Sequence, residues 1–312
     1  MDPRIPALIR IGYALLVLVN LAALYPNLEL WFGESGVLPR KVFLEDYNPA
    51  LWTLLLWVPP GHVALELCFW VFVAHAVCLL LGIGSRFSAA ATFVWLVSFQ
   101  NRNDLILDGE DKVMRLIGFL LIFMPLAEVF SIDSRLWPRE NKGQTTEGES
   151  GPSPWAVRVL QFLMVLIMFA TGLCKVVGAP WQDGTALYYV ARIDDLFGRF
   201  PIPHFLFDTP WIVRLLTWSV VVAELLIPIT IWIPALRRAS LVALLAFHLS
   251  NEYTMQLFLF HWIMLCGWIS FLSTEDLNWF TGLLRRFRGE KAAPEMLQIA
   301  DEASAPAGMT PQ

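Results

Sequence analysis

The sequence is poor in charge. Only 16% of its 312 residues are Asp, Glu, Lys or Arg, while 57% are hydrophobic, and a soluble globular domain usually carries about 25% charged residues. This shortage excludes a protein that is soluble over its whole surface. The formal net charge of -5 also excludes the basic surface that nucleic acid requires. We therefore predict a chain embedded in a lipid bilayer, without a nucleic-acid partner.

Cysteines and metal-binding motifs are scarce as well. The four cysteines, Cys68, Cys78, Cys174 and Cys266, lie in apolar runs and form no CxxC pair. They therefore predict neither a redox centre nor a zinc site, although a disulfide between helices stays open. The sequence has no HExxH pattern, and we predict no metal site.

Long apolar runs are what the sequence has in abundance. A bilayer core of about 30 Å is crossed by roughly 20 residues of α-helix. The runs of that length predict an all-α fold, a polytopic transmembrane helical bundle of about eight spans. The predicted spans are 8–27, 62–83, 86–107, 113–131, 155–177, 211–233, 238–256 and 257–273. The apolar stretch 50–58 is too short to span, and its two tryptophans are expected at the membrane interface.

The spans form two halves of one membrane domain. A stretch rich in Gly, Ser and Pro separates them and predicts a flexible linker. The predicted organisation is one transmembrane domain over 1–275, with halves at about 1–140 and 155–275 and a linker at 141–154. A cytoplasmic tail is predicted over 276–312, disordered after about 291.

Lysines and arginines predict the orientation. Cytoplasmic loops of membrane proteins carry an excess of these residues. The excess lies on the side of the bundle that includes Arg4, Arg10 and Arg135. Both termini are therefore predicted in the cytoplasm, and most of the polar clusters that interrupt the apolar runs then lie at the external end.

The first polar cluster ends the third predicted span. Asp108 and Asp111 suit the start of the next helix, where free N–H groups favour negative charge, so capping and a functional role both stay open for them. Asn101, Arg102 and Asn103 stand where an apolar helix should be finishing. For these three we favour substrate binding or a polar network over a plain loop.

Lys175 ends the fifth predicted span and is followed by Trp181 and Gly184. It lies about 26 Å along the helix from Arg158, at 1.5 Å per residue, and so near the external boundary of the membrane. Two interpretations are open. Lys175 extends to the headgroups and complements the C-terminus of its helix, or it is partly dehydrated, neutral and able to act as a base.

Two further clusters lie in the second half. Glu224 stands inside an apolar run with Pro228 one turn later, so its carboxyl group must face the bundle, either protonated or paired with a Lys or Arg. A structural network and a functional pocket both stay open for it. His248 and Glu252 share one helix face, and a hydrogen-bonded pair of His248 and Asn251 is favoured over a metal site.

Three stretches together are similar to the HTTM family, the membrane domain shared by vitamin K-dependent gamma-glutamyl carboxylase and many bacterial proteins. They are QNRNDLILDGEDKVMRLIGFLLIFMP, QFLMVLIMFATGLCKVVGAPWQDGTALYY and FHLSNEYTMQLFLFHWIML. The resemblance covers residues 5–275. It implies that Lys175 matches the lysine that deprotonates reduced vitamin K, that Trp181 and Gly184 match the Trp and Gly downstream of it, and that His248 and Asn251 match the His-x-x-Asn stretch.

The sequence departs from the carboxylase at two positions. Cys174 and Lys175 stand where the carboxylase has two adjacent lysines, and Arg102 stands where it has a functionally important histidine. The large lumenal domain that holds the protein substrate is also not expected. The resemblance therefore does not imply gamma-carboxylation in the strict sense.

These observations predict an integral protein of the bacterial inner membrane that works as a quinone- or lipid-linked enzyme. The reaction would be of the carboxylase-like lyase or ligase type or a quinol-dependent oxygenation, with reduced vitamin K or another quinol as cofactor. The predicted catalytic residues are Lys175, His248 and Asn251, and the predicted substrate-binding residues are Asn101, Arg102, Asn103, Trp181, Gly184, Glu224 and Glu252. Two alternatives stay open: a partner that matures or exports a small peptide of the sporulation-delaying toxin type, and a non-catalytic bundle that binds or transports a small ligand.

Overall fold

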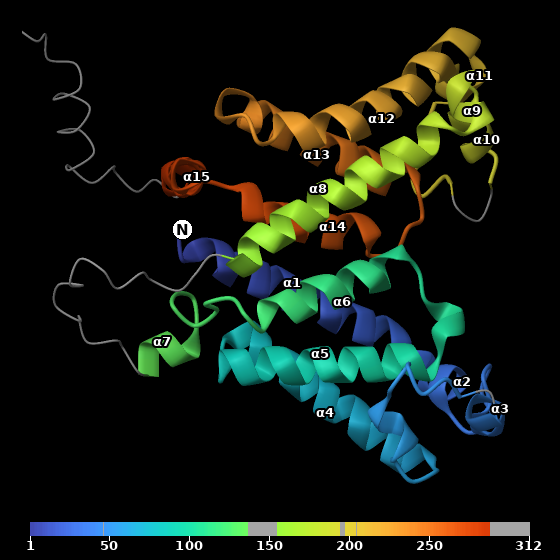
Figure 1. Cartoon of the computed structure of the whole chain (residues 1–312), viewed down its shortest axis with the longest axis vertical. Helices are drawn as coiled ribbons and strands as arrows, with labels where there is room; N and C mark the ends of the chain where they lie inside the picture. Colours follow the sequence, from blue (N-terminus) through green and yellow to red (C-terminus); the bar gives the residue numbers. More distant parts are fainter. Residues whose placement is uncertain (46, 137–154, 194–196, 204, 288–312) are drawn as a thin grey trace, which may run out of the picture. The chain divides into compact units, whose positions relative to one another are not determined.

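A computed structural model describes residues 1–45, 47–136, 155–193, 197–203 and 205–287 (Figure 1). Within these ranges every named element is a helix, and one isolated antiparallel bridge joins Phe197 and Met255. The chain divides into two compact units, 3–271 and 272–312, which are considered separately. The predicted linker at 141–154 and the predicted disorder after residue 291 lie outside the described residues.

The first unit is a bundle of long helices. Those before the linker are α1 (Arg4–Leu24), α4 (His62–Leu81), α5 (Ser85–Arg102) and α6 (Gly109–Leu121); those after it are α8 (Trp155–Val176), α12 (Pro210–Thr230), α13 (Pro234–Thr254) and α14 (Phe260–Trp268). A helix satisfies its own backbone N–H and C=O groups, and for that reason apolar runs of this length adopt it in lipid. Proline stands at the first position of both α12 and α13, where it needs no N–H partner.

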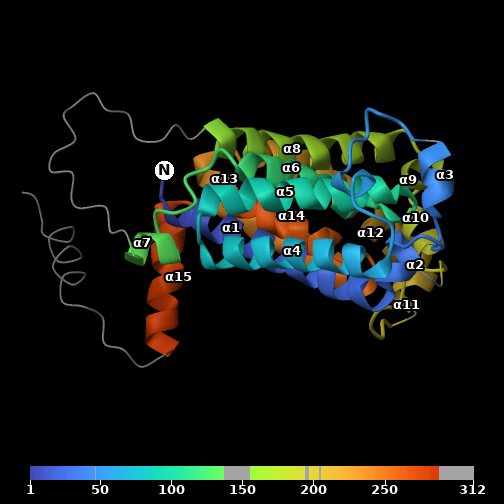
Figure 2. The ribbon, with the colours of Figure 1, turned by 90° about the horizontal axis from the view of Figure 1, so that it is seen from below.

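Short helices gather at the ends of the long ones. Figure 2 shows α2 (Leu28–Phe32), α3 (Arg40–Glu45), α9 (Ala179–Gln182), α10 (Ala186–Val190) and α11 (Phe205–Asp208) at one end of the bundle, and α7 (Ile132–Leu136) at the other. The first of these is called the α3 end below. The α5, α8 and α13 helices finish there, and α4, α6, α12 and α14 begin there. The end of α5 and the end of α8, where the sequence predicts polar clusters, therefore face the same side.

Four helical stretches are long and apolar enough to cross a membrane. They are Arg4–Phe32, His62–Leu81, Trp155–Val176 and Pro210–Thr230. The predicted spans 8–27, 62–83, 155–177 and 211–233 are confirmed in this sense.

The other four predicted spans do not reach that standard, so a bundle of eight spans is not confirmed. The reasons are length and polarity. The α6 helix has 13 residues and α14 has 9. The α5 helix ends in Gln-Asn-Arg, and α13 carries two arginines in its first turns and a polar last turn.

The core of the first unit lies around α1, which packs against α4, α6 and α14. Tyr13 of α1, Phe72 of α4, Met114 of α6 and Ile263 of α14 are each at most 1% exposed. All four cysteines are free thiols, and Cys266 is buried against α1. The described part of the second unit holds α15 (Thr274–Phe287), whose first turn contains Glu275 and Asp276 and whose last turn contains arginines, as the helix dipole favours.

Candidate functional site

Lys175 and Glu224 form an ion pair between α8 and α12. The ammonium Nζ of Lys175 donates to both carboxylate oxygens of Glu224, at 2.8 and 2.7 Å. The Glu224 side chain is 8% exposed and that of Lys175 is 22% exposed. Of the two possibilities that the sequence leaves open for the Glu224 carboxyl group, protonation or pairing, the structure shows pairing.

A glycine allows this pair to form. Gly172 lies one turn before Lys175 on α8, and a Cβ atom added to it would come within 3.1 Å of Cβ of Glu224 and 3.0 Å of Leu225. Small residues let membrane helices approach closely. The α8 and α12 backbones are therefore close enough at Gly172 for a lysine one turn later to reach a carboxylate that lies well inside α12.

The loop after α8 covers the amine. Lys175 Nζ lies 5.2 Å from the ring centroid of Trp181, within the range of a cation–π contact. Gly184 adopts φ +79°, and a Cβ atom there would come within 2.8 Å of Arg214 on α12. Gly184 thus allows a left-handed turn that packs against α12. Trp181 contacts the predicted base directly, whereas the contacts of Gly184 are structural and its role toward a substrate stays a prediction.

The polar end of α5 contacts the segment between α1 and α4. Asn101 Nδ2 donates to the carbonyl of Trp52 at 2.8 Å, and Asn103 Nδ2 donates to that of Trp31 at 2.8 Å. Arg102 is 3% exposed. Its guanidinium group donates to the carbonyls of Leu38 and Gly33, and it lies over the ring of Phe43.

This arrangement is a polar network, one of the two roles that the sequence predicts for Asn101, Arg102 and Asn103. The polar atoms that it uses are held by the chain's own backbone, so direct contact with a substrate stays a prediction. The predicted interfacial stretch 50–58 belongs to the same network, because the hydroxyl of buried Thr53 donates to the carbonyl of Ser98 at 2.7 Å.

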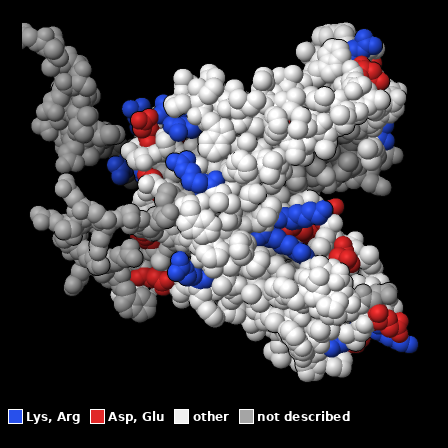
Figure 3. Space-filling model, in the orientation of Figure 1, with Lys and Arg blue, Asp and Glu red and all other residues white. Residues whose placement is uncertain are grey.

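A second layer of the network joins α5 to the start of α6. Arg115 Nη2 donates to Asn101 Oδ1 at 2.7 Å, and its Nε donates to Gln100. Gln100 Nε2 donates to Asp111 at 2.8 Å, and Asp111 and Asp108 form a capping box at the N-terminus of α6. Burial raises the pKa of Asp111 above its usual value, although the hydrogen bonds from Asp108 and Gln100 favour the charged form. Figure 3 shows acidic and basic side chains gathered around this end of α6, while the surface over α8 and α12 is mostly uncharged.

His248 pairs with a histidine that belongs to the next helix. Its Nδ1 atom lies 3.2 Å from Nδ1 of His261 on α14, and both residues are at most 4% exposed. Asn251 does not contact His248 through its amide nitrogen, which donates to the carbonyl of Phe247 in its own helix at 2.9 Å. The hydrogen-bonded pair of His248 and Asn251, which the sequence favours over a metal site, is not found in the structure, because a hairpin between α13 and α14 brings a second imidazole to His248.

Glu252, on α13, forms an ion pair with a residue of the loop between α10 and α11. Arg199, in the stretch between α10 and α11, forms an ion pair with Oε1 of Glu252. The same stretch lies alongside the C-terminal end of α13. Gly198 N donates to the carbonyl of Thr254 at 2.8 Å, and the Tyr253 hydroxyl donates to that of Pro201 at 3.0 Å. Among the described residues, no three His, Cys, Asp or Glu side chains are placed to hold a metal ion.

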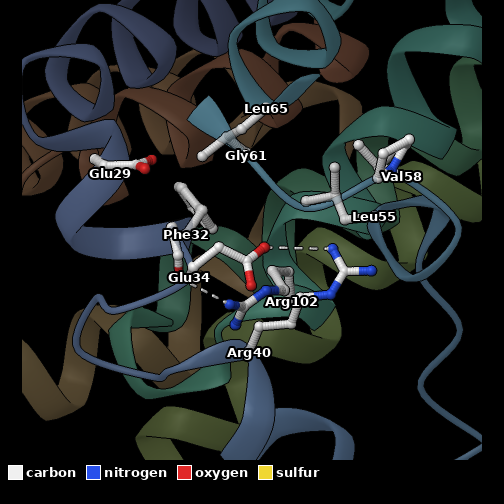
Figure 4. A pocket seen from close by; sticks show the side chains of 11 residues that line it. Glu29, Phe32, Glu34, Arg40, Leu55, Val58, Gly61, Leu65 and Arg102 are labelled. Carbon is white, nitrogen blue, oxygen red and sulfur yellow. Dashed lines mark hydrogen bonds and ion pairs between the residues drawn. The ribbon is translucent and has the colours of Figure 1, made fainter. Parts of the chain in front are cut away.

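A small cavity lies at the base of the α2–α3 segment. Figure 4 shows Arg40, Arg102 and Glu34 converging at its wall, with Leu55 and Leu65 opposite. Its volume is ≈ 20 Å³, about the room for one water molecule. Sites for drug-sized ligands are usually some hundreds of Å³, so this cavity as it stands does not accommodate a quinone ring.

The predicted residues thus fall into three groups of contacts on different helix pairs. Lys175, Glu224 and Trp181 meet between α8 and α12, the 101–103 cluster joins α5 to the α2–α3 segment, and His248 and Glu252 lie at the α13–α14 hairpin. Arg199 and Arg115 also belong to these contacts, and neither is a site residue predicted from the sequence. Arg199 lies outside the three stretches that resemble the family, and Arg115 lies within the first of them without a recognisable role; only the folded chain brings Arg199 beside a carboxylate and Arg115 beside two side-chain amides.

Comparison with known proteins assigns the chain to a protein family. The HTTM domain matches residues 3–279, nearly its whole length. The chain belongs to the HTTM family. This HTTM protein is also 28% identical over 136 residues to "Uncharacterized protein YitO" of Bacillus subtilis (strain 168). The matched part covers 42% of this chain and 41% of that protein, less than half of either. No solved structure matches this chain. The predicted family is confirmed, and so is the coarser prediction of a membrane protein.

Proposed function

We propose that this HTTM protein is a membrane enzyme in which Lys175, paired with Glu224, removes a proton from a lipid-soluble hydroxyl compound of the quinol class. The observation that carries the proposal is the contact of Lys175 Nζ with both oxygens of a carboxylate whose side chain is 8% exposed. Ionisable groups within membrane helices are costly and are typical of functional sites.

The pair explains how a lysine could act as a base. Two opposite charges in a poorly solvated site are costly unless they stay together. Transfer of one proton from Nζ of Lys175 to Glu224 removes both charges and leaves a lone pair on the amine. The neutral Nζ atom then accepts the proton of the substrate hydroxyl, the O–H bond breaks, and its electron pair stays on the oxygen. Glu224 retains the first proton while this occurs.

The surroundings of the amine fit a lipid-soluble aromatic compound. Trp181 presents its ring to Lys175, and the Lys175 side chain as a whole is 22% exposed, more than the 8% of its partner Glu224. A bound quinol would supply an acidic hydroxyl group at this position. Trp181 would orient the quinol ring by stacking against it, and Glu224 would hold the Lys175 amine in place.

Full gamma-carboxylation is not part of the proposal. Arg102 occupies the position of the carboxylase histidine, and its guanidinium group is bound to two backbone carbonyls of the α2–α3 segment. An arginine side chain is not deprotonated in proteins and so cannot replace a histidine as a base. We propose that the position serves the loop between α1 and α4 in this protein, and that the reaction does not extend to carboxylation. The deprotonated quinol is instead oxidised to the quinone by molecular oxygen, which is reduced to hydrogen peroxide.

We further propose the bacterial inner membrane as the location, with both termini in the cytoplasm. The excess of Lys and Arg supports this orientation. It places the α3 end, with Lys175 near it, at the external face. A quinol dissolved in the bilayer would then reach the pair from the side, through the outer leaflet.

The test uses Lys175→Arg, which keeps a positive charge beside Glu224 but cannot supply a neutral base. The full chain is placed in proteoliposomes with reduced vitamin K, and its oxygen-dependent consumption is followed by absorbance and compared with protein-free liposomes. Wild type should exceed the protein-free rate. Lys175→Arg should lose about 100-fold of that excess, as expected for a general base, with little change in melting temperature.

Lys41→Arg is the matched control, because Lys41 is 87% exposed and lies at the same end; it should behave as wild type. If Lys175→Arg consumes the quinol as fast as the wild-type protein does, Lys175 is not the base. If the wild-type protein consumes it no faster than protein-free liposomes do, the quinol reaction is excluded and the pair is a structural or ligand-binding element.

A further inference from the structure

The helix that follows the bundle has a defined start. The α15 helix covers Thr274–Phe287, mostly within the predicted cytoplasmic tail, and two residues separate it from Phe271, where the first unit ends. Ser273 N donates to Asp276 Oδ2 at 2.9 Å, and Asp276 N donates to Ser273 Oγ at 3.2 Å. This reciprocal cap fixes where the helix begins. It therefore also fixes which side chains share a helix face.

One face of α15 is apolar and largely uncovered. At roughly 3.6 residues per turn, one half of the helix circumference holds Leu277, Trp279, Phe280 and Leu283. Asp276 falls on the same side, but its carboxylate is used by the cap. Trp279 is 68% exposed and Phe280 is 55% exposed. An amphipathic helix normally buries such a face, so these two rings point to a partner outside the described residues.

The charges of α15 are divided between its two ends. Glu275 and Asp276 stand in the first turn, where they complement the N-terminus of the helix. Arg285 and Arg286, both exposed, stand in the last turn. Over positions 285–291 the sequence has four basic residues and one acidic residue. A basic segment next to a membrane domain attracts anionic lipids.

We propose that α15 lies in the membrane interface and binds anionic lipid, with Trp279 and Phe280 directed into the acyl chains and Arg285 and Arg286 on the headgroups. Exposed aromatic side chains and a basic polar part are typical of interfacial helices, and tryptophan prefers this depth. The lipid is also within reach, because α15 starts two residues after a unit that contains helices long and apolar enough to cross a membrane. The leaflet is the cytoplasmic one in the orientation proposed above. The placement does not depend on the reaction proposed for Lys175.

Contact quenching of a bimane label tests the depth of α15. The full chain, with its four native cysteines replaced by alanine, carries either Phe280→Cys or Gly282→Cys, which lie on opposite faces of the helix. A Cβ atom at Gly282 would meet nothing within 4 Å, so this position accepts a side chain. The labelled protein is placed in bilayers of equal parts phosphatidylcholine and phosphatidylglycerol. The label at Phe280→Cys should be quenched by nitroxides on the lipid acyl chains and little by aqueous iodide, and the label at Gly282→Cys should show the reverse.

The headgroup of the nitroxide lipid tests the arginines. At Phe280→Cys, nitroxide phosphatidylglycerol should quench more than nitroxide phosphatidylcholine at the same density, with a local enrichment of roughly fivefold, the effect of one basic residue at an anionic surface. Arg285→Gln together with Arg286→Gln should remove this preference. Lys41→Gln together with Arg135→Gln, two exposed changes outside α15, should keep it.

Three outcomes would overturn the proposal. Equal iodide quenching at Phe280→Cys and Gly282→Cys would place α15 in water. Shielding of Phe280→Cys from both quenchers would mean that protein covers the apolar face, either a second copy of the chain or another part of the same one. Equal quenching by the two nitroxide lipids, with both arginines present, would mean that α15 does not select anionic lipid. If Phe280→Cys fails to fold, Trp279→Cys replaces it on the same face.

Discussion

Arg10 is the largest side chain that the bundle buries completely. It contributes to the excess of basic residues that predicts a cytoplasmic N-terminus, and nothing in its spacing indicates a structural role. In the structure its Nη1 donates to the carbonyls of Leu79 and Leu80 at 2.6 and 2.8 Å, and its Nη2 to that of Phe130 at 2.6 Å. These carbonyls include the last ones of α4, which have no partner within the helix. Arg10 therefore caps α4 from α1 and complements its dipole.

Arg10→Met tests this role at the scale of one residue. Methionine fills a similar volume but removes the guanidinium donors from all three carbonyls, of which that of Leu79 keeps the N–H of Gly82 at 3.2 Å. The free energy of unfolding should therefore fall by about 2–4 kcal/mol. Unfolding in mixed detergent micelles, followed by tryptophan fluorescence, measures the change. Arg86→Met is the control, because Arg86 is exposed and, among the described residues, donates to one backbone carbonyl, that of Ile122. A loss no greater than that of the control would mean that Arg10 does not stabilise the end of α4.

Single residues also show what the sequence could predict about the site and what it could not. Lys175 and Glu224 could each be singled out, since a charge in an apolar run is costly wherever the helix lies. Their pairing could not, because they are separated along the chain and meet only where Gly172 brings α8 against α12. The same holds for His248, whose partner His261 depends on how tightly the α13–α14 hairpin turns.

At the scale of elements, the end of α5 holds the α2–α3 segment to the bundle. Three consecutive residues, Asn101, Arg102 and Asn103, each bind a backbone carbonyl of the chain between α1 and α4. The segment between α1 and α4 consists of short helices and loops, so many of its backbone carbonyls need hydrogen-bond donors from other parts of the bundle. Side chains from the last turn of α5 supply the donors, and for this reason an apolar helix ends in three polar residues.

Arg102→Ala should therefore loosen the α2–α3 segment. Loss of two bonds from a buried guanidinium group should lower the free energy of unfolding by about 2–4 kcal/mol. It should also increase hydrogen exchange of backbone amides over residues 28–45 more than elsewhere in the bundle. Mass spectrometry of exchanged peptides measures the second effect. Lys41→Ala, an exposed change within the same segment, should leave both unchanged. Uniform exchange in Arg102→Ala would argue against a local clamp.

Elements differ in how well the sequence predicts them. The apolar runs at 62–83 and 155–177 predicted α4 and α8 within about two residues, because hydropathy and helix formation coincide there. The predicted span 113–131 ran past the end of α6 at Leu121. The segment after it remains apolar, so hydropathy gives no sign that the helix has stopped. Hydropathy reports which residues avoid water, and packing decides how many of them belong to one helix.

At the scale of the whole molecule, the short helices lie at the two ends of the bundle. The α2, α3 and α9–α11 helices lie at the α3 end and α7 lies at the other. The orientation proposed from Lys and Arg assigns the α3 end to the outside. Two positions on opposite ends make this testable: Lys41 on α3 and Arg135 on α7 are both exposed, so a cysteine at either should be reachable by a soluble reagent from its own side only.

The test replaces the four native cysteines with alanine and introduces Lys41→Cys or Arg135→Cys, one at a time. Bacterial cells that express each variant are treated with a membrane-impermeant maleimide, before and after permeabilisation. Lys41→Cys should label in intact cells, and Arg135→Cys only after permeabilisation, because the bilayer separates the two ends. The reverse pattern would place Lys175 near the cytoplasmic face, and the substrate of the Lys175–Glu224 pair would then approach from the inner leaflet. Equal labelling of both positions in intact cells would contradict a membrane between the two ends of the bundle.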